Sequence, residues 1–213
     1  MISSPITGPD QALRVLLEGN ARFVAGSPEH PNQDAGRRAA LAPAQRPFAV
    51  LFGCSDSRLA AEIIFDRGLG DLFVVRTAGH VTGAEVLGSI EYAVSVLECP
   101  LVVVLGHDSC GAVGAALDAL DQGQLPGGYV RDVVERVTPS VVSARAAGIE
   151  DPDAIVDEHI RQTVDLLLER SQLLAARAAE GSVGVVGLSY RLRDGQARTV
   201  AARGAAATTT TAG

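Results

Sequence analysis

The segment LVVVLG at residues 101–106 is the last of three short apolar runs in the first half of the chain. The earlier runs are FAVLF at residues 48–52 and DLFVV at residues 71–75. A stretch with helical patterning follows each run; these stretches are residues 59–68, 85–98 and 110–123. Apolar strands that alternate with helices are typical of a parallel sheet covered on both faces. The pattern therefore predicts a fold of the α/β class.

The second half of the chain is expected to extend this sheet. VGVVGLSY at residues 183–190 and QARTVAA at residues 196–202 are predicted strands, and the turn at Asp194-Gly195 between them indicates an antiparallel hairpin. Helical patterning occurs in two further stretches, residues 130–147 and 153–180. We therefore expect a mostly parallel sheet with an antiparallel C-terminal edge strand and flanking helices.

Composition divides the chain of 213 residues into three expected parts. Residues 1–46 are expected to form an N-terminal helical arm, and residues 47–204 the α/β domain. The C-terminal residues 205–213, AAATTTTAG, are of low complexity and are expected to be disordered.

The arm contains one clear helical pattern. Residues 10–24 place apolar side chains near one helical face, with Asp10 as the expected N-cap. Residues 25–47 are rich in proline and lack periodicity, which predicts a long loop. The helix is therefore separated from the domain in sequence, and it can pack either on a partner subunit or on the core of its own chain.

Charge and composition exclude several classes of function. The chain has 18 basic and 25 acidic residues and a net charge of −7, which disfavours binding to nucleic acids or anionic membranes. The chain contains no lysine, and all of its basic residues counted above are arginine, so a P-loop lysine, a Schiff-base lysine and a Ser–Lys dyad are excluded.

Cysteine content and hydropathy indicate the compartment. The three cysteines, Cys54, Cys99 and Cys110, give no obvious disulfide framework. The N-terminus lacks the apolar core of a signal peptide, and no run approaches the roughly 18 apolar residues that span a membrane. We therefore expect a cytoplasmic protein with reduced thiols and no membrane partner.

Polar residues follow the first and third predicted strands, where each strand ends. Cys54, Asp56 and Arg58 follow the first strand, and His107 and Cys110 follow the third. The carboxyl ends of parallel strands lie at one edge of a sheet, where ligands bind at a switch in winding direction. If the strands are ordered 2-1-3, two thiols, an imidazole and a carboxylate meet there.

Thiolates, imidazoles and carboxylates are zinc ligands, and two Cys with one His and an open fourth position form a known type of catalytic zinc site. Cys54, His107 and Cys110 are the predicted ligands of one Zn²⁺ per chain. Asp56 can occupy the fourth position or leave it to water, and Arg58 can hold Asp56 in a bidentate pair. A redox pair of Cys54 and Cys110 is the rival interpretation, but it leaves Asp56 and His107 without a role.

The remaining cysteine and histidines are expected to be less important. Cys99 precedes the third strand and is expected to be a buried core residue. His30 is expected to be exposed in the proline-rich segment, and His159 is expected to be solvated on a charged helix face. His80 follows the second strand at the same sheet edge and is a candidate for the pocket.

The motifs CSDSR at residues 54–58 and GHDSCG at residues 106–111 resemble those of the β-class carbonic anhydrases. The resemblance covers most of residues 10–190. It also includes four other stretches, LLEGNARF (16–23), RPFAVLF (46–52), DLFVVRTAGH (71–80) and SIEYAV (89–94).

This resemblance implies a sheet of order 2-1-3-4 and a homodimer or homotetramer, with the N-terminal helices lying across the partner. It implies zinc on Cys54, His107 and Cys110, with Asp56 and Arg58 as a paired catalytic dyad. It further assigns substrate contacts to four residues, Gln45, Phe73, Tyr92 and the backbone of Gly111. The chain departs from the family at residues 77–80, where it reads TAGH and many relatives read Asn-x-Ala-Asn.

The implied activity is the reversible hydration of CO₂ to bicarbonate and a proton, in which hydroxide on the zinc attacks CO₂. Two alternatives remain open at this point. The first is hydrolysis of carbon disulfide or carbonyl sulfide on the same scaffold. The second is a non-catalytic structural or sensing site in which Asp56 permanently fills the fourth zinc position.

Overall fold

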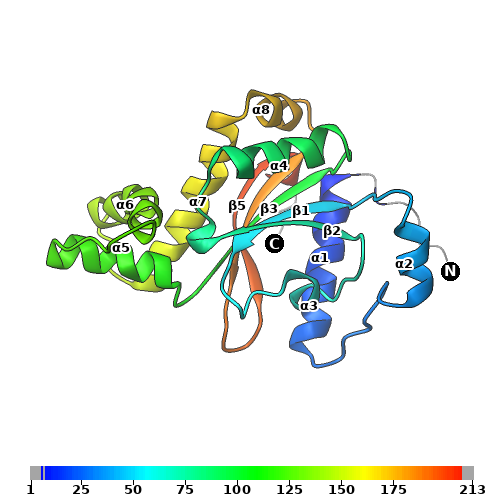
Figure 1. Cartoon of the computed structure of the whole chain (residues 1–213), viewed down its shortest axis with the longest axis horizontal. Coiled ribbons are helices and arrows are strands. Elements are labelled where there is room, and N and C mark those ends of the chain that lie inside the picture. The colour runs from blue at the N-terminus through cyan, green and yellow to red at the C-terminus, as the bar shows by residue number, and fades with distance from the viewer. Residues whose placement is uncertain (1–5, 7, 208–213) are drawn as a thin grey trace.

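The fold is built on one five-stranded sheet, seen in the computed structural model of Figure 1, which describes residue 6 and residues 8–207. The strands are β1 (Ala49–Cys54), β2 (Leu72–Thr77), β3 (Leu101–His107), β4 (Gly184–Tyr190) and β5 (Ala197–Gly204). Their order is β2-β1-β3-β4-β5. The first four strands pair in parallel, and β5 pairs antiparallel to β4. The predicted order and the predicted antiparallel edge strand are both confirmed.

Helices connect and cover the strands. They are α1 (Pro9–Val24), α2 (Ala35–Leu41), α3 (Ala61–Ile64), α4 (Ala84–Ser95), α5 (Gly111–Gln122), α6 (Val130–Ala146), α7 (Pro152–Arg170) and α8 (Gln172–Ala179). Two short 3-10 helices are η1 (Ala78–His80) and η2 (Ala205–Ala207). The helical stretch expected at 153–180 is divided at Ser171, whose hydroxyl caps α8 by accepting from the Leu174 amide.

The two central strands form the core of the domain. Every residue of β1 and β3 is buried, because the sheet is covered on both faces. Helix α4 contacts β1 and β2, and α7 contacts β3, β4 and β5. Burying one Val, Leu or Phe side chain stabilises a fold by about 1.5–3 kcal/mol, so these apolar runs dominate its stability.

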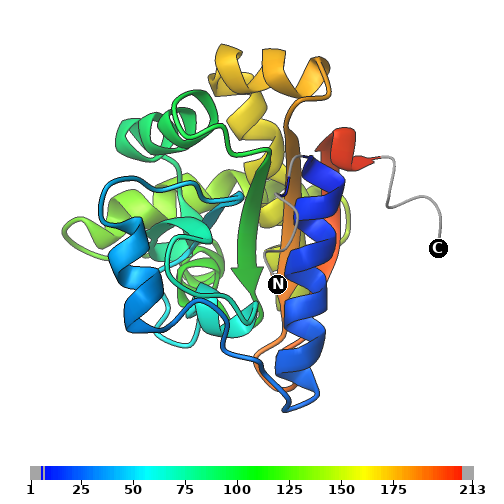
Figure 2. The ribbon, with the colours of Figure 1, turned by 90° about the vertical axis from the view of Figure 1, so that its right-hand side faces the viewer.

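Helix α1 packs on its own chain. It contacts α3, β3 and η2, and its side chains Ala12, Leu13 and Leu16 are buried. The Asn20 side chain donates to the Gly195 carbonyl at 2.8 Å and accepts from the Ala197 amide at 2.9 Å. Figure 2 shows α1 running alongside the strands. Of the two placements left open by the sequence, the described chain therefore uses its own core.

The N-terminal region differs from the expectation in two details. Helix α1 begins at Pro9 with Gly8 as the N-cap, so the prediction that Asp10 is the N-cap is wrong; the proline fits the first helical position. Helix α2 lies within the stretch expected to be a loop, and the side chain of Asp34 caps it. No residue of α2 is buried, which explains why its sequence lacks an apolar period.

The C-terminal segment is ordered further than expected. Residues 205–207 form η2, and Ala206 is fully buried beside Gly184 and Pro9. The expected disorder therefore does not extend to these three residues, while residues 208–213 lie outside the described part. In the described part, no helix combines the length and apolar character needed to cross a membrane.

The carboxyl edge of the sheet is the edge that presents polar residues. Strands β1 and β3 are parallel neighbours, so their final residues lie side by side. In Figure 1, α5 and α6 project from this end of the molecule, whereas α2 lies at the other end.

Candidate metal centre

Three ligand atoms converge at the carboxyl edge of the sheet. Cys54 ends β1, His107 ends β3, and Cys110 directly precedes α5. One ligand atom from each residue lies within 4.8 Å of the others, and all three residues are buried. Residues 53 positions apart in sequence meet because the strand order places β1 beside β3. The predicted ligand cluster is therefore present.

The imidazole of His107 is oriented for a metal ion. Its Nδ1 lies 2.8 Å from the carbonyl oxygen of Asp108. A carbonyl can only accept, so Nδ1 carries the proton and the neutral ring presents a lone pair at Nε2. The Nε2 atom is buried and has no hydrogen-bond partner among the described residues. A metal ion would satisfy it, so the residues fit zinc.

The electrostatics of the cluster also favour a cation. A hydrogen bond from Cys110 and the neighbouring His107 lower the pKa of the Cys54 thiol to about 4, against the opposing effect of burial. The pKa of the Cys110 thiol is raised, because its proton is hydrogen-bonded to the Cys54 sulfur and because the residue is buried. Burial lowers the pKa of His107, but the Cys54 thiolate outweighs this and raises it. The thiolate thus attracts positive charge to the centre.

The carboxylate of Asp56 lies beside the cluster and is held by Arg58. Nε and Nη2 of Arg58 donate to the two carboxylate oxygens at 2.9 and 2.7 Å, and the Arg58 amide donates at 2.9 Å. The bidentate pair lowers the pKa of Asp56, so the carboxylate is ionised. Its Oδ2 is 3.9 Å from Nε2 of His107, so Asp56 borders the metal position.

Two backbone-directed contacts support the loop after β1. The Nε of Arg76 donates to the Cys54 carbonyl at 2.9 Å, and its Nη2 donates to the Asp56 carbonyl. The Gly79 amide donates to Sγ of Cys54 at 3.3 Å. Sequence reasoning gave neither residue a role. The parallel register, which pairs Thr77 with Cys54, is the signal that places this segment beside the ligand.

Comparison with known proteins now identifies the family. A family model described as carbonic anhydrase matches residues 49–197. A solved β-carbonic anhydrase of Aspergillus fumigatus superposes with a TM-score of 0.68 and 28% identity, covering 89% of this chain and 91% of that one. The chain belongs to the β-carbonic anhydrase family.

Curated relatives agree with this assignment. Carbonic anhydrase 2 of Mycobacterium tuberculosis is 60% identical over 193 residues, covering 91% of this chain and 93% of the relative. The carbonic anhydrase of Mycolicibacterium smegmatis is 58% identical over 192 residues, covering 90% and 93%. Members of the β-carbonic anhydrase family are lyases, and the match spans nearly the full length of these relatives.

Three of the substrate contacts implied by the β-carbonic anhydrase resemblance lie away from the Cys54–His107–Cys110 cluster within one chain. Phe73 is opposite Val50, four positions before Cys54, and so lies about 13 Å from the ligand end along the strands. The Tyr92 ring is 6.2 Å from that of Phe73 and is 46% exposed. Gln45 precedes β1 and lines a small cavity with α2 and residues 96–98, at the amino edge of the sheet.

Gly111, the fourth implied contact, does lie at the β-carbonic anhydrase metal centre. It follows the ligand Cys110 directly and opens helix α5. The amides of a first helical turn have no acceptors within the helix, so they can receive an anion. The position is consistent with the role that the resemblance implies.

The burial of Cys99 and His30 is as expected, whereas that of His159 is not. Cys99 is buried and its pKa is raised to about 12 by burial, which fits a core residue, and His30 is exposed. The prediction that His159 is solvated is wrong: it is 4% exposed and is hydrogen-bonded to Ser140 and to Gly79. It is buried because its ring lies between Ser140 on α6 and the residues Gly79 and His80 after β2. His80 is fully buried and stacks on His159.

Proposed function

We propose that this chain catalyses the zinc-dependent, reversible hydration of CO₂ to bicarbonate and a proton. One observation carries the proposal: two thiols and the bare Nε2 of His107 converge while Arg58 holds Asp56 in a bidentate pair. Three protein ligands with an accessible fourth position are typical of catalytic zinc.

Each residue of the centre has a defined task. Cys54, His107 and Cys110 would hold one Zn²⁺ per chain, and Asp108 fixes the His107 tautomer through its carbonyl. A Zn²⁺ ion there supplies a Lewis acid that makes water a nucleophile near neutral pH. Asp56 stays ionised beside Arg58, so it can accept a hydrogen bond and orient the group that attacks CO₂.

The Asp56–Arg58 pair also bears on the non-catalytic alternative. A closed structural site requires the carboxylate as its fourth ligand. Both carboxylate oxygens instead accept from Arg58, whose guanidinium is about half-exposed. The arrangement therefore favours an open, catalytic centre over a structural or sensing one.

We also propose that the active form is a homodimer or homotetramer, in which a second copy supplies Gln45, Phe73 and Tyr92 to the centre. Within one chain these side chains lie toward the other end of the sheet. Strand β2 is at one edge of the sheet, and its residues are only partly buried. A second chain placed against this edge would bring its own copies near the ligands.

The thiols support a reducing compartment, and we propose the cytoplasm. Cys54 and Cys110 must both be reduced to bind zinc, yet they lie close together and are free in this structure. An oxidising environment would favour their pairing over metal binding.

The proposal is tested by zinc content and CO₂ hydration in the parent and in ligand variants. Cys54→Ser and His107→Ala should lose zinc and lower the hydration rate by more than about 100-fold, which exceeds the usual cost of removing a group that only hydrogen-bonds to a ligand. Cys99→Ser should lose neither zinc nor activity, because Cys99 is buried away from the cluster and donates to the Pro47 carbonyl.

Two outcomes would contradict the assignment. Full zinc content in His107→Ala would refute the ligand set. A zinc-loaded parent that hydrolyses carbonyl sulfide or carbon disulfide but does not hydrate CO₂ would refute the substrate.

A further inference from the structure

A chain of hydrogen bonds leads from the Cys54 sulfur to helix α7. The Gly79 amide donates to Sγ of Cys54 at 3.3 Å, and the Gly79 carbonyl accepts from Nε2 of His159 at 2.9 Å. On its other side, Nδ1 of His159 is 2.8 Å from the Ser140 hydroxyl. One residue, Gly79, thus connects a predicted zinc ligand with an imidazole 105 residues later in the sequence, through the two peptide groups that flank its Cα.

The contacts of His159 determine its tautomer. A carbonyl oxygen only accepts, so Nε2 must carry the proton that faces Gly79. Nδ1 then accepts from the hydroxyl of Ser140. Burial lowers the pKa of His159, so the ring remains neutral and keeps this arrangement.

Packing confines Gly79 and the ring of His159. Gly79 has a φ of 61°, and a Cβ placed there would lie 2.6 Å from Cβ of Ala112, so the segment is pressed against α5. The ring of His80 stacks on His159 with centroids 4.4 Å apart. Neither nitrogen of His80 has a hydrogen-bond partner among the described residues, so His80 contributes packing alone.

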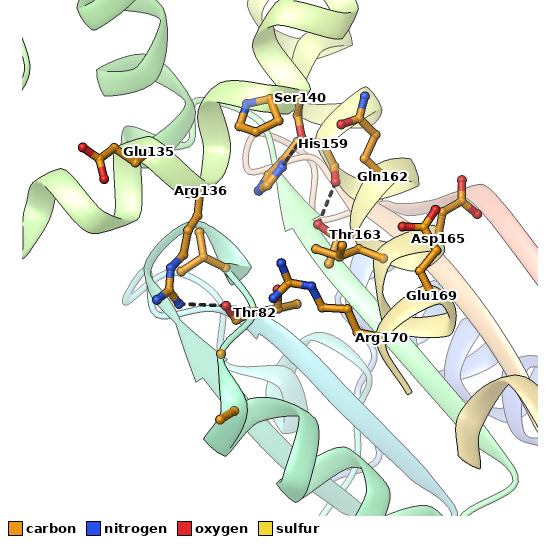
Figure 3. A pocket seen from close by; sticks show the side chains of 15 residues that line it. Thr82, Glu135, Arg136, Ser140, His159, Gln162, Thr163, Asp165, Glu169 and Arg170 are labelled. Atoms are coloured by element: carbon orange, nitrogen blue, oxygen red, sulfur yellow. Dashed lines mark hydrogen bonds between the residues drawn. The ribbon is translucent and has the colours of Figure 1, made fainter. Parts of the chain in front are cut away.

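At the end away from Cys54, this chain of hydrogen bonds reaches a cavity, shown in Figure 3, whose wall includes Ser140 and His159. Its charged lining comes from α6 and α7 and consists of Glu135, Arg136, Asp165, Glu169 and Arg170. Figure 3 shows the His159 ring turned away from Asp165 and Glu169. The ring nitrogens are hydrogen-bonded to the Gly79 carbonyl and the Ser140 hydroxyl, so neutral groups fix the ring.

We propose that His159 is a positioning residue that holds Gly79 by its carbonyl, so that the amide on the other side of the same Cα points at the Cys54 sulfur. Through this hydrogen bond His159 adjusts how much charge the sulfur gives to the metal. The inference rests on the proposed zinc site and adds to it a residue that does not touch the ion.

The direction of the effect follows from electrostatics. An amide that donates to a thiolate stabilises the negative charge on sulfur, so the sulfur donates less of that charge to a bound cation. Without the hydrogen bond, the sulfur lone pairs lie higher in energy. The transition that moves charge from sulfur to the metal then requires less energy.

Cobalt-loaded protein provides the test, because its thiolate-to-metal absorption band reports the energy of the sulfur electrons. In His159→Phe, which keeps a ring but has no donor, the band should move to longer wavelength than in the parent. In His159→Gln, whose side-chain amide can donate to the Gly79 carbonyl, the band should return toward the parent position. Thr163→Val is the matched control: Thr163 lines the same cavity on α7, donates only to the His159 carbonyl, and should leave the band unchanged.

A second measurement needs no variant. In cadmium-loaded parent protein, the Gly79 amide proton should show scalar coupling to the metal through the Cys54 sulfur, and His159 should have the Nε2–H tautomer. Absence of this coupling, or an Nδ1–H tautomer, would overturn the proposal. So would a folded His159→Phe protein with the parent absorption band, or a Thr163→Val shift as large as that of His159→Phe.

These results are distinguishable from failure of the proposed function. If the parent binds neither cobalt nor zinc through Cys54, the zinc site itself is refuted, and the present inference with it. If the parent binds metal and hydrates CO₂ while the His159 measurements show no effect, only the positioning role is refuted.

Discussion

Among single residues, Asp56 and Arg58 form the pair that borders the proposed metal position. The arginine meets both carboxylate oxygens, and its own amide adds a third donor to Asp56. The pair is local, since its two residues are two positions apart in one turn. Removing Arg58 leaves an ionised carboxylate 3.9 Å from the His107 imidazole with no side-chain partner.

We predict that Arg58→Ala lowers CO₂ hydration by about tenfold or more at neutral pH, which is typical of losing a residue that orients a group beside a metal ion. The freed carboxylate is then able to turn toward a bound cation and occupy its fourth position. Hydroxide competes with the carboxylate more effectively as pH rises, so the parent rate should increase between about pH 6.5 and 9. The pKa of Asp56 is lowered, so its own titration lies below this window and does not contribute.

The measurement is a pH–rate profile of the parent, Arg58→Ala and Asp56→Asn, with zinc content determined for each. Asp56→Asn should retain zinc and lose much of the pH dependence, because a neutral amide is a poor competitor for the ion. A flat parent profile, or full activity of Arg58→Ala, would show that Asp56 does not control the site.

At the scale of elements, helix α1 belongs to the core although a proline-rich segment separates it from the sheet. The Leu16 side chain is removed from water when the chain folds, since it has no solvent exposure in the structure. Asn20 hydrogen-bonds the helix to the turn between β4 and β5. The helix therefore stabilises the domain through both apolar burial and backbone hydrogen bonds.

We predict that Leu16→Ala lowers the free energy of unfolding by about 2–5 kcal/mol, because the truncation leaves a cavity in a packed region. Urea unfolding followed by circular dichroism provides the measurement. Arg14→Ala, an exposed position on the same helix, is the control and should change stability by less than about 0.5 kcal/mol. Equal stabilities of the parent and Leu16→Ala would mean that α1 does not pack on this core in solution.

On the scale of the whole molecule, the residues of the family's site are divided between the two ends of the sheet. Cys54, His107 and Cys110 lie at the carboxyl edge, whereas Gln45 lies at the amino edge. A single chain therefore holds the proposed metal ligands without all the proposed substrate contacts. This division is the reason that we propose a second copy in the active form.

Complementation between inactive variants tests this requirement. Chains carrying Gln45→Ala retain the ligands, and chains carrying His107→Ala retain Gln45. After denaturation, mixing in equal amounts and refolding with zinc, about a quarter of the sites in randomly paired dimers should combine intact ligands with an intact Gln45. Recovery of CO₂ hydration above that of either variant refolded alone is the expected result, and no recovery would contradict a shared site.

Much of this protein is determined by local sequence. Three apolar runs become β1, β2 and β3. The runs of β1 and β3 are continuous because strands buried on both faces need apolar sequence throughout. Cys54, His107 and Cys110 could be grouped from the sequence because parallel strands place their carboxyl ends at one edge. Asp56 and Arg58 could be paired because they are two residues apart.

Only the tertiary structure decided which polar side chains support that centre. His159 follows a charged pattern along α7, yet it is buried, since contact with Gly79 joins segments 80 residues apart. Arg76 holds the loop after β1 through backbone carbonyls, which carry no sequence signal. Local patterns describe what a segment exposes on average, whereas burial and long-range hydrogen bonds depend on which segments the fold brings together.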